Sequence, residues 1–461
     1  MNRILVAIPC FLAAIAAYGQ GNGAANPFGN PIGTTVQLPT FGVSFDANGV
    51  LNLKTFSDPD GELLRERFAA AKRDLTGNLT KAVKQRKISL VRLEAALNRC
   101  AEAGVMPDES ILSLAGLTRI TSAFCYPDDN DIVLVGPAEP WIRDFAGNPI
   151  GLVSGRPILR LEDLAVAIRA FRPKFAAKAF VGCTISPQRE GLAKLQAFQR
   201  KIPRSVADHE QAEVARWVAS GVRDSLGSET VQVFGISAKT NFARVMIEAD
   251  YRMKRIAVGV EQPPIRMTTF ASALSSASDG LQRWWFTPNY KGIMASPDHL
   301  AVKIVGQGVQ LQTENKEVNA AGVIIDSGRK PTRATRAYAT SFTNRYDEIA
   351  KAAPVYGQLR QLTDWLIIAA FLQKNDWYRL AKWDASILCD ESVLPTETMN
   401  NPESAPVVVN AFWKKRRMFT PAGGGVSIEP LRALERVEID PGFKVLAPRK
   451  LPVAIEAWWW D

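Results

Sequence analysis

The chain has 461 residues, of which 47% are hydrophobic and 22% are charged. This balance excludes disorder over most of the length, which requires low hydrophobicity together with high net charge. The length predicts two or three globular units, and the formal net charge of +10 favours anionic partners.

The first residues predict a secretory signal peptide over residues 1–19. Arg3 supplies a positive charge, an apolar stretch of about 14 residues follows, and Ala17-Tyr18-Gly19 fits a cleavage site before Gln20. Such a stretch is shorter than the ~20 residues that span a membrane. We therefore expect a soluble exported protein, periplasmic or extracellular, without a transmembrane span. Its expected partner is an anionic envelope polymer or an envelope protein, and export argues against nucleic acid.

Residues 20–40 are rich in Gly, Asn and Pro and predict a flexible linker. Residues 41–127 predict a hairpin followed by a small helical unit. Asn48-Gly49 supplies the turn of the hairpin, Ser89 caps one helix, and Pro107-Asp108 opens another.

From residue 128 to residue 313 short apolar runs alternate with amphipathic segments, which predicts a mixed β-sheet with packed helices, an α+β fold. Expected strands cover 132–135, 150–153, 179–185, 231–236, 284–286, 301–305 and 309–312. Expected helices lie near 161–171, 192–202, 214–222 and 240–255, whereas 314–331 is expected to be a loop. Residues 332–390 predict a helix pair divided at Ala353-Pro354, and residues 391–461 predict an irregular wrapping tail.

The sequence contains few candidate catalytic residues. The two histidines, His209 and His299, lack the spacing of a zinc motif and the setting of a serine triad. Two acidic clusters suit turns and helix caps, or two acids acting on a glycan: Asp58, Asp60 and Glu62, and Asp128, Asp129 and Asp131. We expect no metal and no cofactor, and the catalytic residues stay unknown.

Four cysteines follow the predicted signal peptide: Cys100, Cys125, Cys183 and Cys389. Export permits two disulfides among them. Cys100 also continues the apolar stripe of Leu93 and Leu97, so a buried free thiol is an equal alternative.

Basic clusters and tryptophans give the candidate ligand-binding residues. Lys414, Lys415, Arg416 and Arg417 lack nearby acids and form a candidate anion patch. The basic run of residues 252–255 is instead explained by helical ion pairs, Glu248 with Arg252 and Asp250 with Lys254, on a solvated face. Trp284 and Trp285 are candidates for stacking on sugars, although strand alternation places one of them in the core.

The remaining signals concern the C-terminal part. Gly423-Gly424-Gly425 lacks the context of a phosphate loop and predicts a turn before a strand at 426–428. Trp458-Trp459-Trp460 predicts an end that docks in a groove or contacts a partner.

Five segments together resemble an exported bacterial family known as domain of unknown function 1598. They are VLVGPAE (133–139), GRP (155–157), ADYRMKRIAVG (249–259), RWW (283–285) and APVYGQLRQLTD (353–364). The resemblance implies a secreted address over about residues 41–426, and it brings no activity, cofactor or catalytic residue. The prediction is a non-catalytic binding or scaffold protein of the cell envelope; the alternatives are a carboxylate-based hydrolase of envelope glycans and a structural subunit that docks through its Trp-rich end.

Overall fold

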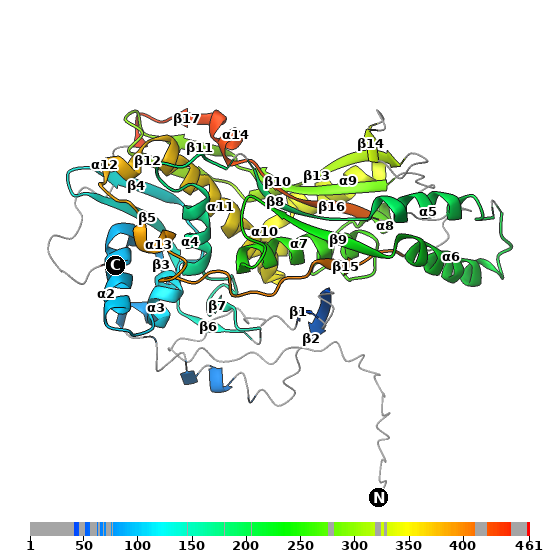
Figure 1. Cartoon of the computed structure of the whole chain (residues 1–461), viewed down its shortest axis with the longest axis horizontal. Coiled ribbons are helices and arrows are strands. Elements are labelled where there is room, and N and C mark those ends of the chain that lie inside the picture. Colours follow the sequence, from blue (N-terminus) through cyan, green and yellow to red (C-terminus); the bar gives the residue numbers. More distant parts are fainter. Residues whose placement is uncertain are drawn as a thin grey trace, which may run out of the picture.

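Two β-sheets and the helices packed on them make up the molecule, which confirms the predicted α+β fold (Figure 1). The computed structural model describes residues 41–45, 51–55, 62, 65–67, 69–70, 75, 77–144, 146–178, 180–203, 205–274, 281–318, 324–326, 330–410, 422–443 and 459–461. The predicted signal peptide and linker lie outside these residues.

One sheet has six strands in the order β17-β11-β12-β4-β5-β3. In chain order these are β3 (Val83–Ser89), β4 (Ser122–Tyr126), β5 (Asp131–Ala138), β11 (Gly292–Ala295), β12 (Ala301–Val305) and β17 (Val437–Ile439). Residues 41–127 thus supply two strands besides the predicted helices. Strand β3 was not predicted, because its sequence VKQRKIS contains few apolar residues and therefore lacks the regular alternation of apolar and polar side chains that indicates a strand.

The other sheet has seven strands in the order β14-β13-β10-β16-β8-β9-β15. They are β8 (Val181–Ser186), β9 (Ser228–Phe234), β10 (Leu281–Asn289), β13 (Gly308–Val318), β14 (Ile324–Asp326), β15 (Ser404–Pro406) and β16 (Ala422–Ile428). Two expectations are corrected here: the polar segment 314–331 contains the end of β13 and β14, and the predicted irregular tail supplies a central strand.

Gly423-Gly424-Gly425 lies inside β16, so the predicted turn is wrong. The reason is close packing between β10 and β8. A Cβ atom on Gly424 would stand 1.9 Å from the carbonyl oxygen of Trp284, and one on Gly425 would stand 2.5 Å from the Trp285 ring. Only glycine allows the backbone of this strand to approach its neighbours so closely.

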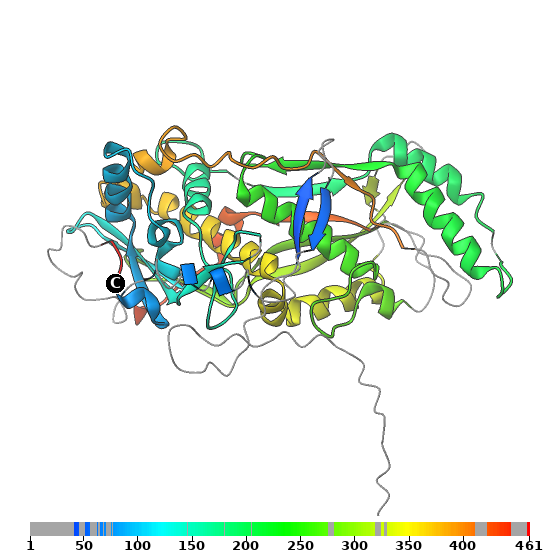
Figure 2. The same ribbon diagram turned by 90° about the horizontal axis from the view of Figure 1, so that it is seen from below.

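Two further strand pairs lie outside the large sheets: β1 (Phe41–Phe45) with β2 (Leu51–Thr55), and β6 (Trp141–Arg143) with β7 (Pro149–Gly151). The first confirms the strands of the predicted hairpin, which lies across the middle of the molecule in Figure 2, while its Asn48-Gly49 turn falls outside the described residues.

The described residues form thirteen α-helices, α2 to α14. They are α2 (Leu90–Glu102), α3 (Glu109–Leu112), α4 (Leu161–Ala170), α5 (Arg189–Gln199), α6 (Gln211–Leu226), α7 (Asn241–Ala257), α8 (Phe270–Ala273), α9 (Arg333–Asn344), α10 (Tyr346–Ala352), α11 (Pro354–Lys374), α12 (Trp377–Leu380), α13 (Ser386–Cys389) and α14 (Pro430–Ala433). Ser89 and Asp108 cap α2 and α3 as predicted, and α11 begins at Pro354.

Helix α11 forms the centre of the core and contacts α4, α7, α10 and β13. Nearly all of its residues are buried, which explains why it carries apolar side chains on every face. Helices α5 and α6 instead pack on each other and project from one end (Figure 1). Within the described part of the chain, no helix is long and apolar enough to cross a membrane.

The C-terminal residues dock against the edge strand β3. Trp460 forms a bridge with Ile88, and the Ser89 amide donates to the Trp459 carbonyl at 2.8 Å. Trp459 is buried and the Arg86 guanidinium lies 5.0 Å from the Trp460 ring centre. The described part of the tryptophan run therefore docks within its own chain, one of the two predicted outcomes.

Candidate functional site

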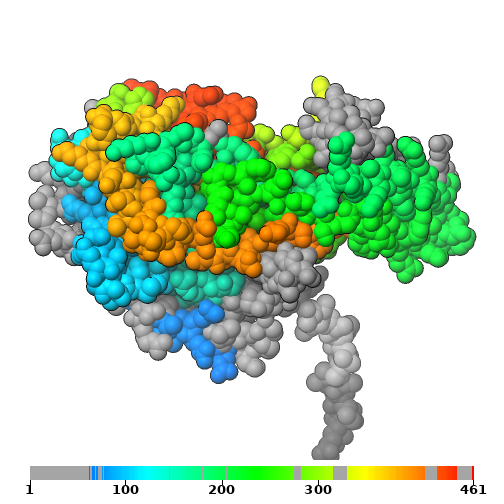
Figure 3. All heavy atoms as spheres, viewed as in Figure 1, coloured from blue at the N-terminus to red at the C-terminus, as the bar shows by residue number. Residues whose placement is uncertain are grey.

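A cavity of about 540 Å³ lies between the end of α2, the loop that leads to α3, the start of α4 and residues 387–398. We call it the apolar pocket. In Figure 3 the orange segment that includes residues 387–398 runs as a band along the side of the body. Its walls are mainly aliphatic: Leu97, Ala101, Val105, Met106, Pro107, Leu112, Pro149, Leu161, Ile387, Val393, Leu394 and Pro395.

Three apolar side chains line the pocket and are also exposed. Met106 is 84% exposed, Val105 is 57% exposed and Val393 is 37% exposed. Exposed aliphatic groups that continue into an apolar cavity are typical of an entrance for an apolar ligand.

Arginines and one acid supply the polar end of the apolar pocket. Arg143 donates to the Gly147 carbonyl at 2.8 Å and pairs with Glu109 at 2.9 Å. Arg160 pairs with Glu162, the residue that follows it by two positions. These ion pairs hold the guanidinium groups in fixed positions beside the aliphatic walls.

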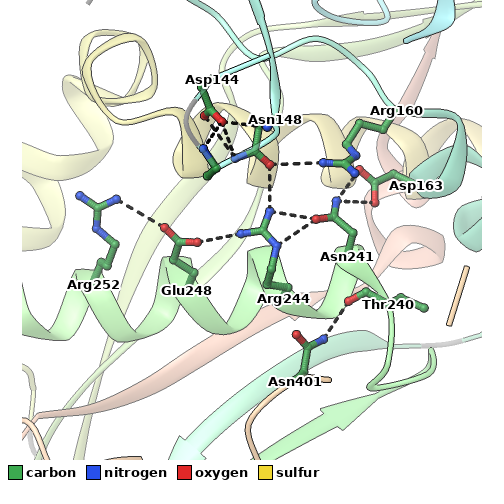
Figure 4. A network of polar contacts seen from close by, with 11 residues as sticks. Asp144, Asn148, Arg160, Asp163, Thr240, Asn241, Arg244, Glu248, Arg252 and Asn401 are labelled. Atoms are coloured by element: carbon green, nitrogen blue, oxygen red, sulfur yellow. Dashed lines mark hydrogen bonds and ion pairs between the residues drawn. The ribbon is translucent and has the colours of Figure 1, made fainter. Parts of the chain in front are cut away.

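A buried polar network supports Arg160 from behind (Figure 4). Arg160 and Arg244 both donate to the Asn148 side-chain oxygen, at 3.2 Å and 3.3 Å. Arg244, on α7, also donates to Glu248 at 2.9 Å and to Asn241 at 2.8 Å. The network therefore fixes the loop that carries Asn148, and through it the polar end of the pocket.

Asp163 belongs to the same network. It accepts from the Asn241 amide at 3.1 Å. Burial, followed by the nearby Glu162 carboxylate, raises the pKa of the Asp163 carboxyl to about 7. Since Asp163 is buried and lies behind the lining residues, we assign it a positioning role rather than contact with a ligand.

A second buried cluster lies between α7 and β9. Lys254 pairs with Asp250 at 2.9 Å and donates to the Ile185 carbonyl at 2.7 Å. Glu229 is also fully buried, and burial raises the pKa of its carboxyl to about 8. The predicted helical pairs of α7 are confirmed, but the predicted solvated face is wrong, because the Asp250–Lys254 pair packs on the sheet and the Glu248–Arg252 pair is also buried.

Two of the sequence-predicted ligand residues, Trp284 and Trp285, are described by the structure. Trp284 is fully buried, stands edge-on to Phe270 and Tyr338 with ring centres 5.4 Å apart, and donates to the Thr335 carbonyl. Trp285 is half-buried under the Arg283 guanidinium. Neither lines the apolar pocket, and Lys414, Lys415, Arg416 and Arg417 fall outside the described residues.

The three acids of the cluster after β4 differ in how far they are exposed to solvent. Asp128 and Asp129 are exposed in the turn, whereas Asp131 is buried and accepts from the Ser89 hydroxyl at 2.7 Å. Asp58 and Asp60 of the other cluster lie outside the described residues, and Glu62 is exposed. Among the residues that are described, no group of three His, Cys, Asp or Glu side chains could hold a metal ion.

Both histidines are exposed, and the four cysteines that the structure describes are free thiols. Cys100 is half-buried and lines the apolar pocket. Sequence reasoning placed Cys100 on an apolar stripe but missed the pocket. Its walls come from three segments far apart in the chain, and the exposed pair Val105-Met106 between two helices was the only local signal.

Comparison with known proteins gives one match. Residues 183–270 match the family described as "Protein of unknown function (DUF1598)", the family that the sequence resembles. This region contains the ADYRMKRIAVG segment and the cluster of Glu229, Asp250 and Lys254, while the other four segments lie outside it. No curated protein and no solved structure matches the chain.

Proposed function

We propose that this chain is an exported, non-catalytic binding protein that holds a mainly apolar small molecule in the apolar pocket. The observation that carries the proposal is the cavity itself. Its volume of about 540 Å³ falls within the roughly 300–1,000 Å³ of small-molecule sites, and its lining combines many aliphatic groups with a few fixed polar ones.

The polar groups of the pocket also favour binding over catalysis. Arg143 and Arg160 are each tied to a carboxylate, and the acid with the perturbed pKa, Asp163, lies behind them. Such an arrangement orients one end of a ligand. The predicted signal peptide supports a location in the cell envelope, where apolar molecules need carriers.

Dye binding tests the proposal. The fluorescent dye 1-anilinonaphthalene-8-sulfonate is added to the protein as recovered from cells, and dodecanoate is then used to displace the bound dye. Ala101 lines the pocket at the last turn of α2, so Ala101→Trp fills the cavity. We expect a loss of dye affinity of about tenfold or more with unchanged melting temperature.

The matched control is Ala212→Trp, at an exposed position of α6 on the projecting end. This variant should bind the dye as the unmodified protein does. Absence of dye binding to the unmodified protein, or equal binding by Ala101→Trp, contradicts the proposal. Recovery of the chain with Met1 intact and only from the cytosol contradicts its exported location.

A further inference from the structure

A second, smaller cavity of about 140 Å³ adjoins the apolar pocket. Its lining residues are Arg67, Ala70, Leu75, Glu109, Trp141, Ile142 and Arg143. Arg143 lines both cavities, so this side chain lies between the two spaces. One water needs about 10–15 Å³ of such space, so the smaller cavity has room for a carboxylate or phosphate group with accompanying water.

One acid, Glu109, is among the described residues that line the smaller cavity. The Glu109 carboxylate accepts from Arg143 at 2.9 Å, from the Trp141 indole at 3.3 Å and from the Ser113 hydroxyl at 2.7 Å. Glu109 therefore balances the charge of Arg143 and leaves none to balance a second cation.

Arg67 is that second cation. Its one hydrogen bond to another described residue runs from Nη1 to the Arg143 carbonyl at 3.3 Å. Its Nε is buried and has no hydrogen-bond partner among the described residues. A buried donor without an acceptor costs about 1–3 kcal/mol, and an anion beside the guanidinium would remove that cost. Among the described residues that line the smaller cavity, Arg67, Arg143 and Glu109 together carry one excess positive charge.

We propose that the smaller cavity binds the oxyanion headgroup of a single-chain amphipathic ligand whose hydrocarbon chain occupies the apolar pocket. This inference rests on the proposed function, and it adds the chemical class of the ligand. Arg67 supplies the charge that recognises the headgroup. Arg143, held by Glu109, marks the position where headgroup and chain meet.

Three ligands of equal chain length test the headgroup site by calorimetry: dodecanoate, dodecyl phosphate and the neutral 1-dodecanol. Hydrogen bonds to charged groups contribute about 1.5–3 kcal/mol, so we expect at least one of the two anions to bind about ten- to a hundredfold more tightly than the alcohol. Tighter binding of dodecyl phosphate assigns a phosphate headgroup, and tighter binding of dodecanoate assigns a carboxylate. Both results support the proposal.

Arg67→Gln should abolish the preference for the anion and leave the affinity for 1-dodecanol unchanged. Arg65→Gln is the matched control, because Arg65 is an exposed arginine two residues away. Equal affinity of the unmodified protein for the alcohol and both anions overturns the headgroup site while the proposed function stands. If none of the three ligands binds, the proposed function fails as well.

Discussion

Arg119 and Asp364 form a two-point ion pair although 245 residues separate them in the sequence. Arg119 Nε lies 2.7 Å from Oδ2 and Nη2 lies 3.2 Å from Oδ1 of the fully buried Asp364. The Tyr290 hydroxyl donates to the same carboxylate at 2.7 Å, and Arg119 Nη1 donates to the Gly306 carbonyl at 2.6 Å. The contacts join α11 to segments of both sheets.

Loss of this carboxylate should destabilise the protein strongly. Asp364→Asn leaves the Arg119 charge largely buried without a counter-charge, for which we expect a loss of about 3–5 kcal/mol in the free energy of unfolding. Denaturation in urea measures the change. Asp376→Asn is the control, because Asp376 pairs with Arg379 and these side chains are 57% and 73% exposed, and it should cost about 1 kcal/mol or less. Equal losses in the two variants would contradict this assignment.

Glu229 should make stability depend on pH. In the folded state its carboxyl has a pKa of about 8, against about 4.5 in the unfolded chain, because burial and the nearby Asp250 carboxylate raise this pKa by more than the Lys254 ammonium group lowers it. The folded protein therefore retains a proton that the unfolded chain releases above pH 4.5. This contribution to stability is complete below pH 4.5 and falls by up to about 1.4 kcal/mol per pH unit until pH 8.

Glu229→Gln removes this dependence, so the variant should match the unmodified protein near pH 4.5 and be more stable than it at pH 8, by about 2 kcal/mol or more. Urea denaturation at a series of pH values provides the measurement. Glu403→Gln, at an exposed position near the same edge of the sheet, should follow the unmodified protein throughout. Parallel curves for the Glu229 variant and the unmodified protein would show that Glu229 is ionised in the folded state.

Cys100 should report occupancy of the apolar pocket. It is a half-buried free thiol in the pocket wall, whereas Cys125 and Cys183 are buried and Cys389 is half-buried outside the wall. Saturating dodecanoate should slow alkylation of Cys100 by a maleimide about tenfold or more and leave Cys389 unaffected, as followed by peptide mass spectrometry. Equal protection of both thiols would indicate a general tightening of the protein instead.

The glycine run of β16 should tolerate alanine at one position and not at the next. A Cβ atom at Gly424 meets the Trp284 carbonyl oxygen at 1.9 Å, whereas a Cβ atom at Gly423 meets only the flexible Arg283 side chain, at 3.3 Å. We expect Gly424→Ala to cost about 1–3 kcal/mol or more and Gly423→Ala to stay within about 1 kcal/mol. The melting temperatures of the two variants, measured by thermal unfolding, test this expectation. Similar melting temperatures would contradict the packing described for β16.

The sequence predicted those parts of the fold in which side chains repeat with a clear period. Helix α7 and the helices before and after Pro354 were predicted because apolar residues recur at helical spacing or a proline marks the boundary. Strand β3 was missed because Lys84, Gln85, Arg86 and Lys87 conceal it. Of β16 only the part at 426–428 was predicted, because the glycines before it have no side chain to show alternation.

Burial was harder to predict than pairing. The spacing of Asp250 and Lys254 predicts an ion pair on any helix, but it does not show that α7 packs against β8 and β16 and that the pair is buried. The apolar pocket was beyond sequence reasoning for a similar reason. Leu97, Leu161 and Leu394 meet only after the chain has folded, and each alone is an ordinary core residue.

The position of β16 also affects synthesis of the chain. This strand pairs with β10 on one side and β8 on the other, yet it is translated well over a hundred residues after β10 begins. Until the ribosome has added residues 422–428, both neighbouring strands keep an open edge that can pair with other nascent chains. The seven-stranded sheet can therefore close only after residues 422–428 have been translated, and premature termination before residue 422 should yield aggregates that require chaperones, rather than a smaller folded protein.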